Sequence, residues 1–540
     1  MATETELKLQ PAHARDLPRL LAHPRLAALE PQRERLVATY FDTPALDLLR
    51  ARMAVRERRE GRRHVATVKT AGLVIGGLSR RGEWEAPMPA GARRFASLVD
   101  DPALADWLRA REGALQPVFR TAFTRLRWQL AFEGARIEVA LDHGAIVSGG
   151  PQGRAREPLL ELELEVLEGP DDALFALALE LAEALPLWPL AASKAERGYA
   201  LFLRAQGSRP PPATPRPRAS WPAATPADQV FAQLAHEVLD ALAPPLRDAA
   251  HTRSRGSAEA AEAVHQSRVA LRRLRALLGV FAPALPAGWA AQWRLAWGEL
   301  ARALGAVRDL DVLRHDVWPL LAATPTAQRR LASLQRRLQQ AQAQAWQALQ
   351  AELATPATAA LLLRFARAVH ALAAPEPGAT AGSTPARGEV PSGHGTGPAQ
   401  PPTAPPIGVF ARERLRQRRR RVRRALEAAE ATRLRDAERL HALRIEVKKL
   451  RYATEALAAA LGGAAARKAR VRLPVLEQAQ SALGRWNDVH GAGARLAALA
   501  PPPRAGHAAA LTALAQALTP ARERARKQVR RACEDLDDVL

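Results

Sequence analysis

Apolar and polar residues alternate through most of the first 205 positions, with the period of two that is typical of β-strands. Two stretches with helical spacing, at about 92–110 and 171–185, interrupt this alternation. The alternating runs are TETELKL, RMAVRER, HVATVKT, RRGEWEA, FTRLRWQL, ARIEVALD and LLELELEV. This part of the chain is therefore predicted to form an α+β domain built on an antiparallel sheet.

After residue 226 the pattern changes to long stretches rich in Ala, Leu and Arg, in which Leu recurs every three or four residues. This spacing predicts an all-α domain whose helices pack as antiparallel hairpins. A Pro-rich stretch at 206–226 is expected to be an extended linker, and a low-complexity stretch at 374–406 has too few large apolar residues to fold. The expected domains are 1–205 and 227–540, the second with a disordered insert at 374–406.

Composition indicates the cellular compartment of the protein and the class of its binding partners. The single cysteine, Cys533, excludes an intramolecular disulfide framework, and the sequence shows neither a signal peptide nor a run of about 18 apolar residues. A cytoplasmic protein without membrane segments is expected. Lys and Arg balance Asp and Glu up to residue 200, 28 against 28, whereas the remainder has 51 against 27. The basic second half is expected to attract polyanions.

The polar faces of the predicted strands carry charges of both signs. Glu4, Glu6 and Lys8 share one face of the first strand, and Glu161, Glu163 and Glu165 share one face of the last. Either a sheet with one solvated face or a closed barrel with a polar interior would explain this pattern. Like charges on one face repel unless a cation lies between them, and carboxylates suit Mg²⁺ or Mn²⁺. Arginines and lysines on neighbouring strands would then hold phosphate groups, since no G-x-x-x-x-G-K-[ST] loop occurs.

The segment ETELKL resembles the E-x-E-x-K signature of the triphosphate tunnel metalloenzymes, or CYTH domains. YFDTPALDLLRARMAVRER, VATVKTAGLVIGGLSRRGEWE, FRTAFTRLRW, IEVALDHG, ELELEV and SKAERGY follow in the order of that family. The resemblance implies an eight-stranded antiparallel tunnel that binds a triphosphate together with a divalent metal.

The same resemblance assigns roles to individual positions. It implies catalytic roles for Glu4, Glu6, Lys8 and Lys194, with Lys194 on a helix that closes one end of the tunnel. The implied metal ligands are Glu4, Glu6, Asp142, Glu161, Glu163 and Glu165. The implied phosphate-binding residues are Lys8, Arg56, Arg58, Lys69, Arg81, Arg125 and Arg127. For each acid the alternative role is a salt bridge to a neighbouring arginine.

A repeat occupies the second half. VHQSRVALRRLRALL begins at Val264 and LHALRIEVKKLRYAT at Leu440, and in both copies a histidine and three basic residues recur at i, i+3, i+7 and i+10 on one helix face. Asp309 and Asp488 also match between the copies. The pattern resembles the CHAD domain, which implies polyphosphate binding by His265, Arg268, Arg272, Arg275, His441, Arg444, Lys448 and Arg451.

Two other ligands fit these stripes less well. Nucleic acid would need aromatic platforms for its bases, and Tyr452 is the one aromatic residue beside either stripe. A metal ion at the histidines would face cationic neighbours. The run RERLRQRRRRVRR at 412–424 is either a solvated helix or an extension of the anion-binding track.

The expected function is metal-dependent hydrolysis of inorganic triphosphate, a short-chain polyphosphate, with polyphosphate held by the second domain. Thiamine triphosphate hydrolysis or ATP cyclisation is an alternative reaction for the tunnel. A polyphosphate-binding or granule-targeting protein with little catalysis is an alternative of another class.

Overall fold

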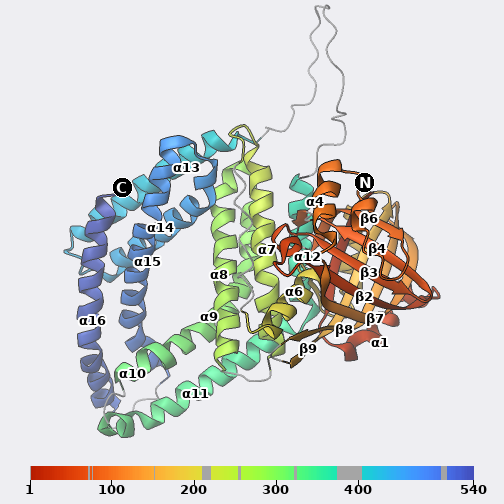
Figure 1. The fold of residues 1–540 in the computed structure, drawn as a ribbon. Coiled ribbons are helices and arrows are strands. Elements are labelled where there is room, and N and C mark those ends of the chain that lie inside the picture. The colour runs from red at the N-terminus through yellow and green to blue at the C-terminus, as the bar shows by residue number, and fades with distance from the viewer. Residues whose placement is uncertain are drawn as a thin grey trace, which may run out of the picture.

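The computed structural model describes residues 2–70, 73–75, 77–150, 153–208, 221–252, 257–321, 325–373, 404–499 and 507–540. A barrel of antiparallel strands is followed by a set of long helices, which lie to one side of it (Figure 1). The antiparallel β-domain and the helical second domain predicted from the sequence are therefore confirmed. The predicted linker at 206–226 and the insert at 374–406 fall mostly outside the described residues.

Eight strands close the barrel. Their order is β1, β9, β8, β7, β2, β3, β4, β6, and β6 pairs back onto β1 through residues 2–7. The short strands β5 and β10 extend β6 and β1. The strands are β1 Ala2–Pro11, β2 Gln32–Asp42, β3 Ala54–Glu60, β4 Arg63–Lys69, β5 Leu73–Ile75, β6 Leu78–Pro87, β7 Gln116–Phe132, β8 Ala135–Gly150, β9 Gly153–Glu168 and β10 Leu187–Pro189.

The barrel reverses the usual placement of polar and apolar faces. Leu7 and Leu9 of β1 are fully buried on its outer side, where they join an apolar cluster that includes Leu174 and Leu177 of helix α5. Glu6 lies on the opposite face, which lines the interior. Because α5 covers the outer face, the alternation that begins at ETELKL places its charges inside a closed barrel.

The barrel domain also contains, in its described residues, six short α-helices. They are α1 Leu17–Leu21, α2 Pro24–Ala27, α3 Asp47–Arg50, α4 Pro102–Glu112, α5 Asp172–Leu181 and α6 Lys194–Ala205. The helix expected at about 92–110 starts later, because Asp101 caps its N-terminus and Pro102 occupies its first turn. Helix α6 starts at Lys194 through a capping box between Ser193 and Glu196.

The second half consists of long helices joined mostly as antiparallel hairpins. Their bounds are α7 Ala227–His251, α8 Ala258–Phe281, α9 Trp289–Val312, α10 Trp318–Leu321, α11 Pro325–Leu353, α12 Pro356–Ala373, α13 Ile407–Glu430, α14 Ala437–Leu457, α15 Gly463–Ala498 and α16 His507–Asp537. A π-helical turn, Leu313–Val317, joins α9 to α10. The search for membrane spans, made on the described residues, finds no helix with the length and apolarity that crossing a bilayer requires.

The barrel and the helices pack directly against each other. Helix α12 lies on α5 and β10, and the apolar cluster of the outer sheet face continues into α7, α8 and α12. Arg367 of α12 binds both carboxylate oxygens of Asp172, and His370 Nε2 lies 3.1 Å from Asp171 Oδ1. The position of the helices relative to the barrel is therefore fixed by both apolar and polar contacts.

Candidate active site and anion-binding surface

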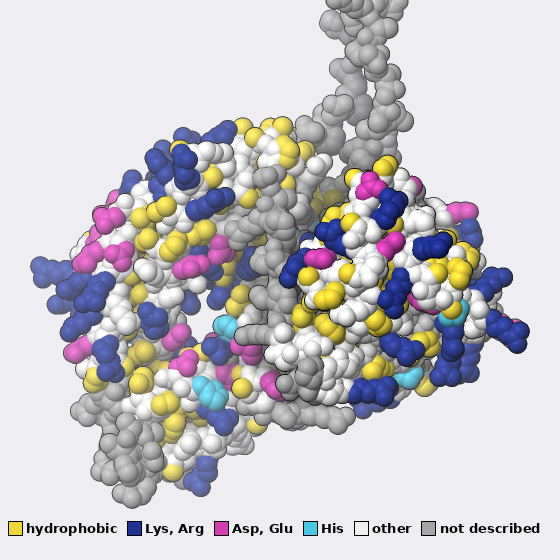
Figure 2. Space-filling model, in the orientation of Figure 1, with side chains coloured by type: hydrophobic (Ala, Val, Ile, Leu, Met, Phe, Trp, Pro, Cys, Tyr) yellow, Lys and Arg dark blue, Asp and Glu magenta, His cyan; other side chains and the backbone are white. Residues whose placement is uncertain are grey.

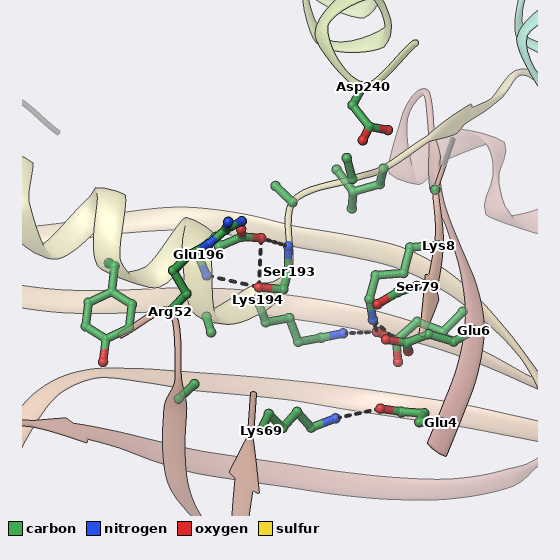
Figure 3. A pocket seen from close by; sticks show the side chains of 18 of the residues that line it. Glu4, Glu6, Lys8, Arg52, Lys69, Ser79, Ser193, Lys194, Glu196 and Asp240 are labelled. Atoms are coloured by element: carbon green, nitrogen blue, oxygen red, sulfur yellow. Dashed lines mark hydrogen bonds and ion pairs between the residues drawn. The ribbon is translucent and has the colours of Figure 1, made fainter. Parts of the chain in front are cut away.

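The interior of the barrel is a cavity of about 2000 Å³ with a mixed-charge lining (Figure 3). It extends beyond the strands to the second domain, where Asp240 of α7, Arg273 of α8 and Tyr452 of α14 also line it. The site residues expected from the sequence that line this cavity are Glu4, Glu6, Lys8, Arg56, Arg58, Lys69, Arg125, Arg127, Glu163, Glu165 and Lys194.

Two of the expected residues are placed differently, and the side chain of a third is not described. Asp142 and Glu161 do not line the cavity but lie behind its wall, fully buried. The backbone of Arg81 pairs with Glu4 between β6 and β1, while the side chain of Arg81 lies outside the described residues.

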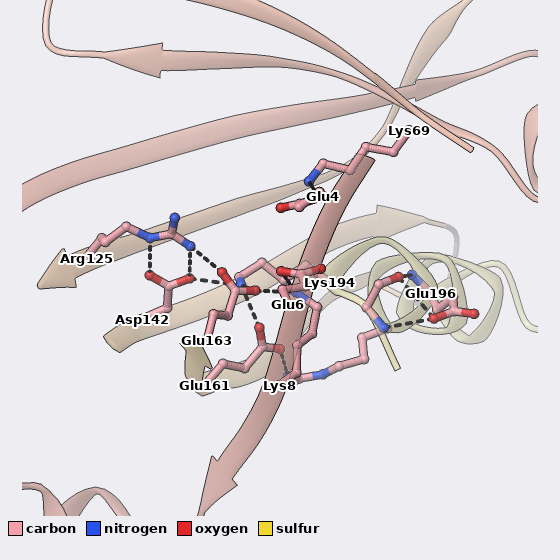
Figure 4. A network of polar contacts seen from close by, with 12 residues as sticks. Glu4, Glu6, Lys8, Lys69, Arg125, Asp142, Glu161, Glu163, Lys194 and Glu196 are labelled. Atoms are coloured by element: carbon pink, nitrogen blue, oxygen red, sulfur yellow. Dashed lines mark hydrogen bonds and ion pairs between the residues drawn. The ribbon is translucent and has the colours of Figure 1, made fainter. Parts of the chain in front are cut away.

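Lys194 lies at the centre of a buried ion-pair network (Figure 4). Its Nζ is 2.9 Å from Asp142 Oδ2, 2.5 Å from Glu161 Oε2 and 2.8 Å from Glu163 Oε1. Burial alone would lower the pKa of Lys194, but these carboxylates outweigh it and hold that pKa well above its ordinary value. The ammonium group therefore stays charged and joins α6 to β8 and β9.

Glu163 also binds two other cations. Lys8 Nζ lies 2.5 Å from Glu163 Oε1 and 2.8 Å from Glu6 Oε2. Arg125 donates from Nε and Nη2 to the two oxygens of Asp142, both at 2.7 Å, and from Nη2 to Glu163 Oε2 at 2.6 Å. Burial would raise the pKa of Glu163, but Lys194, Lys8 and Arg125 keep it well below its usual range.

A second acidic group arises from the strand register. Glu6 lies directly opposite Glu165 between β1 and β9, and Glu165 lies directly opposite Glu138 between β9 and β8. Burial, followed by the charges of Glu4, Glu6 and Glu138, raises the pKa of Glu165 to about 8. Direct cross-strand pairing of like charges is unfavourable. Lys8 contacts Glu6 and Lys69 contacts Glu4, but burial and the acidic neighbours outweigh these cations at Glu165 and keep its pKa raised.

Among the described residues, one acidic set has the geometry of a metal site. Asp142, Glu161 and Glu163 offer oxygens that all lie within 4.8 Å of one another. Lys194 and Arg125 already bind oxygens of that set. Glu4, Glu6, Glu138 and Glu165 also line the cavity. Lys8, Lys69 and Arg127 contact the first three of these acids, and the raised pKa of Glu165 indicates that negative charge prevails around it. A divalent cation with oxygen ligands would relieve that repulsion.

The opposite wall of the cavity is cationic. Lys69 Nζ lies 3.2 Å from Glu4 Oε2 and 2.6 Å from Glu83 Oε2. Burial would raise the pKa of Glu83, but Lys69, a hydrogen bond with Glu4, and Arg56 together lower it to about 2. Lys69 and Arg56 therefore face the interior as charged groups with acidic partners that a phosphate could replace.

Arg58 and Arg127 also line the cavity. Arg58 donates to Glu60 at 2.6 Å and to Glu85 at 2.9 Å, and its side chain is 15% exposed. Arg127 donates to Gln32 at 2.6 Å, and its side chain is 32% exposed, against 7% for Lys194. Arg127 is therefore the more accessible of the two arginines.

Tyr40 is a cavity residue that the sequence analysis missed. It lies on β2, its ring stacks on Phe119 with centroids 4.5 Å apart, and its hydroxyl accepts a hydrogen bond from Arg56 Nη1 at 3.4 Å. Burial would raise the pKa of Tyr40, but Arg56, Lys69 and Lys194 lower it below its ordinary value. Glu138 is a second cavity residue to which the sequence analysis gives no role; the strand register, which places it opposite Glu165, supplies the missing information.

The two basic stripes of the helical domain face each other on α8 and α14. Arg272 Nε donates to the hydroxyl of Tyr452, which links the two helices. Burial and then the charges of Arg444, Arg272 and Arg275 lower the pKa of Lys448 to about 8. The repeats thus bring cations from both copies together, as their matching spacing suggested.

The remaining members of the stripes have polar contacts. Arg268 lies 3.9 Å from Asp309, and His441 Nδ1 lies 3.2 Å from Asn487 Oδ1. Burial and then Arg308 lower the pKa of His265. Arg451 binds Gln480 at 2.8 Å and lies over the Tyr452 ring at 4.2 Å. Lys and Arg side chains also gather over α13, which contains the run 412–424 (Figure 2).

A closed antiparallel barrel with a charged interior, followed by helical hairpins with paired basic stripes, defines a two-domain tunnel protein. Residues 2–199 match the CYTH domain family and residues 241–497 match the CHAD domain family. The chain therefore contains a CYTH domain followed by a CHAD domain, and the resemblance seen in its motifs is confirmed.

Two curated relatives share parts of the chain. An inorganic triphosphatase of Haemophilus influenzae is 34% identical over 203 residues, which are 37% of this chain and 55% of that protein. An uncharacterised protein of Mycobacterium tuberculosis is 31% identical over 294 residues, 52% of each chain. The chain thus spans about half the length of the curated relatives it matches. The crystal structure of the CHAD domain from the plant Ricinus communis covers 59% of this chain and 94% of its own, at 24% identity and a TM-score of 0.43.

Proposed function

We propose that the barrel hydrolyses inorganic triphosphate in a metal-dependent reaction and that the helical domain binds polyphosphate. One observation carries the first part: a closed interior in which cations, among them Lys69 and Arg56, lie with a group of carboxylates whose repulsion raises the pKa of Glu165. A linear triphosphate needs cations along its length, and its hydrolysis needs a held water molecule. The similarity to the Haemophilus triphosphatase supports this reaction.

Glu4, Glu6, Glu138 and Glu165 would hold Mg²⁺ or Mn²⁺, with Glu163 beside them. When bound, such an ion neutralises phosphate oxygens and makes water a better nucleophile. Asp142 and Glu161, which the sequence analysis assigned to the metal, would instead keep Lys194 and Arg125 charged and in place. Lys194 is then a positioning residue as much as a ligand-binding one.

The cations of the barrel would bind the substrate in sequence. Arg127, the most exposed of them, would receive the incoming anion. The cations that would hold it inside are Arg58, Lys69, Arg56 and Lys8. Arg56 offers two parallel N–H groups for paired phosphate oxygens, whereas Lys8 and Lys69 offer single charges. Each of these cations now contacts a carboxylate or the Tyr40 hydroxyl, so substrate oxygens would replace existing partners.

The second domain would bind longer chains. Its stripes bring Arg272, Arg275, Arg444 and Lys448 together, and the lowered pKa of Lys448 indicates positive charge that an anion would relieve. A phosphate chain supplies regularly spaced anionic oxygens and has no bases to stack, which suits a surface with few aromatic residues.

The decisive experiment measures phosphate release by the full chain with Mg²⁺ or Mn²⁺ from triphosphate, pyrophosphate, ATP and thiamine triphosphate. We expect triphosphate to be hydrolysed fastest and EDTA to abolish the activity. Binding of long-chain polyphosphate is measured on the same preparation. Polyphosphate binding without hydrolysis of any substrate would contradict the catalytic proposal and favour a binding module, while rapid conversion of ATP to a cyclic product would favour the cyclase.

A further inference from the structure

A separate groove of about 670 Å³ lies between α13, α14 and α15, and it is closed at one side by Val539 and Leu540. Its volume is in the range of about 300 to 1000 Å³ that small-molecule sites occupy. The residues that line it belong neither to the barrel nor to the two basic stripes. Arg412, Arg416 and Arg419 belong to the basic run 412–424, but no role given above concerns the groove itself.

The floor of the groove is apolar. Leu415 of α13, Leu450 of α14 and Leu476 of α15 form it and are themselves buried. Val409, at its edge, is 51% exposed. A ligand that lies along this floor would gain by removing apolar surface from water.

The rim of the groove is strongly basic. Glu413 is the one acidic residue among the described residues that line it, against five cations. Arg472 Nε donates to the carbonyl of Val539 at 2.6 Å, which fixes one guanidinium at the rim. Burial and then Arg472 lower the pKa of Arg419, so these two arginines share an unrelieved positive field. The cations are Arg412, Arg416, Arg419, Lys468 and Arg472.

We propose that this groove binds an anionic amphiphile, an acyl or alkyl chain that carries a phosphate or carboxylate head. The head group would lie between Arg419 and Arg472, and the chain would lie on Leu415, Leu450 and Leu476. A bare phosphate chain would use the rim but gain nothing from the floor, so the apolar floor distinguishes this site from a polyphosphate track. The ligand is either a free amphiphile or a lipid head group with its chain.

The test uses the full chain and a series of alkyl phosphates from butyl to decyl, below their micelle concentrations, with binding measured by calorimetry. Each added methylene should raise the affinity about three- to fourfold until the groove is filled. Inorganic phosphate serves as the head group alone and decanol as the chain alone, and both should bind far more weakly. An affinity that does not depend on chain length would overturn the proposal.

Variants locate the site. The double substitution Arg419→Ala with Arg472→Ala should weaken decyl phosphate binding at least about tenfold, since two charge contacts are lost. Arg424→Ala removes an exposed arginine of α13 that does not line the groove, and it should bind as the wild type does. Equal binding by the double variant and the Arg424→Ala control would place the ligand elsewhere and overturn the assignment.

Two further measurements distinguish a membrane lipid from a free amphiphile as the ligand. Vesicles of phosphatidylglycerol, compared with phosphatidylcholine, are sedimented with the protein in the presence or absence of decyl phosphate. Capture by the anionic vesicles alone, reversed by decyl phosphate, identifies a lipid as the ligand. Tight binding of monomeric decyl phosphate without capture identifies a free amphiphile, and the absence of both overturns the proposal.

Discussion

Two lysines, the buried Lys194 of the barrel and the half-buried Lys448 of the helical domain, show how differently the two regions use positive charge. Lys194 in the barrel contacts three carboxylates, and its pKa is raised well above the ordinary value. Lys448 in the helical domain is half-buried beside Arg444, Arg272 and Arg275, and its pKa falls to about 8. From the sequence, Lys194 was expected to have a catalytic role at the end of the tunnel and Lys448 to bind polyphosphate, and their surroundings likewise suit different tasks.

The comparison separates a catalytic site from a capture surface. In the barrel most described cations have acidic partners, so the interior is ordered before substrate arrives, and its excess charge is the negative group around Glu165. On α8 and α14 the excess is positive. A preorganised site with local negative charge suits a metal and a short anion, whereas an excess of cations suits a long polyanion whose binding depends steeply on salt.

The largest effect on triphosphate hydrolysis is expected from a substitution that removes negative charge from the barrel. Glu4→Gln combined with Glu6→Gln should lower triphosphate hydrolysis by about 100-fold or more, since two proposed metal ligands are lost. Polyphosphate affinity should stay within about twofold, because the two sites are distinct. Phosphate release and polyphosphate binding are measured on the same protein.

Glu168→Gln is the matched control for this double variant. Glu168 ends the same strand as Glu165, is exposed, and pairs with Arg136 at 2.7 Å. Its substitution should leave hydrolysis unchanged. A double variant that keeps more than about a tenth of wild-type activity, with a normal melting temperature, would rule out Glu4 and Glu6 as metal ligands.

The next largest effect, on polyphosphate binding, is expected from a substitution that removes positive charge from the helical domain. Arg272→Ala with Lys448→Ala should weaken polyphosphate binding about 30-fold, at roughly 1 kcal/mol for each lost charge. The slope of log affinity against log salt should become shallower, and triphosphate hydrolysis should not change. Arg336→Ala, an exposed residue of α11, is the control. Loss of hydrolysis in the double variant would show that the domains act as one site.

The lowered pKa of Lys448 gives a pH signature. Its ammonium is charged below about pH 8 in the free protein and is neutral above it. Polyphosphate affinity should therefore fall about fivefold between pH 7 and pH 9, at about 1 kcal/mol for one charge. The fall should be smaller in Lys448→Arg, because arginine does not lose its proton in this range.

Unfolding does not explain such a loss of affinity. A lysine whose pKa is lower in the folded than in the unfolded state binds fewer protons when folded, so its contribution to stability increases as the pH rises above 8. Thermal melts at pH 7 and pH 9 test this directly. An equal loss of affinity in wild type and Lys448→Arg would assign the titration to another group.

Much of the fold follows from local sequence. The alternation in ETELKL and ELELEV predicted strands with charged faces, and the order of the motifs predicted the closed barrel that the structure confirms. The start of α4 was placed too early because the sequence Asp101-Pro102, a capping residue followed by Pro, received no weight. A short 3₁₀ turn over Phe95–Leu98 occupies part of the earlier stretch.

The organisation inside the site depends on non-local register. Spacing along β9 shows that Glu161, Glu163 and Glu165 share a face, but it does not show that Lys194 reaches two of them from α6. The third lies between Glu6 and Glu138, which come from other strands. Spacing alone therefore could not show which of these acids pair with Lys194 and which lie opposite other acids across the sheet.

The smallest expected effect concerns Tyr40, the polar group of the barrel that the alternation did not reveal. Tyr40→Phe keeps the ring that stacks on Phe119 and removes only the hydroxyl beside Arg56. If that hydroxyl donates to a phosphate oxygen held by Arg56, its loss should reduce kcat/KM for triphosphate about threefold, near the lower end of the ~0.5 to 1.5 kcal/mol of one neutral hydrogen bond. The polyphosphate affinity of the helical domain should not change in this variant. Unchanged kcat/KM would show that Tyr40 only shapes the wall, and the comparison between the two regions would then rest on their charged residues alone.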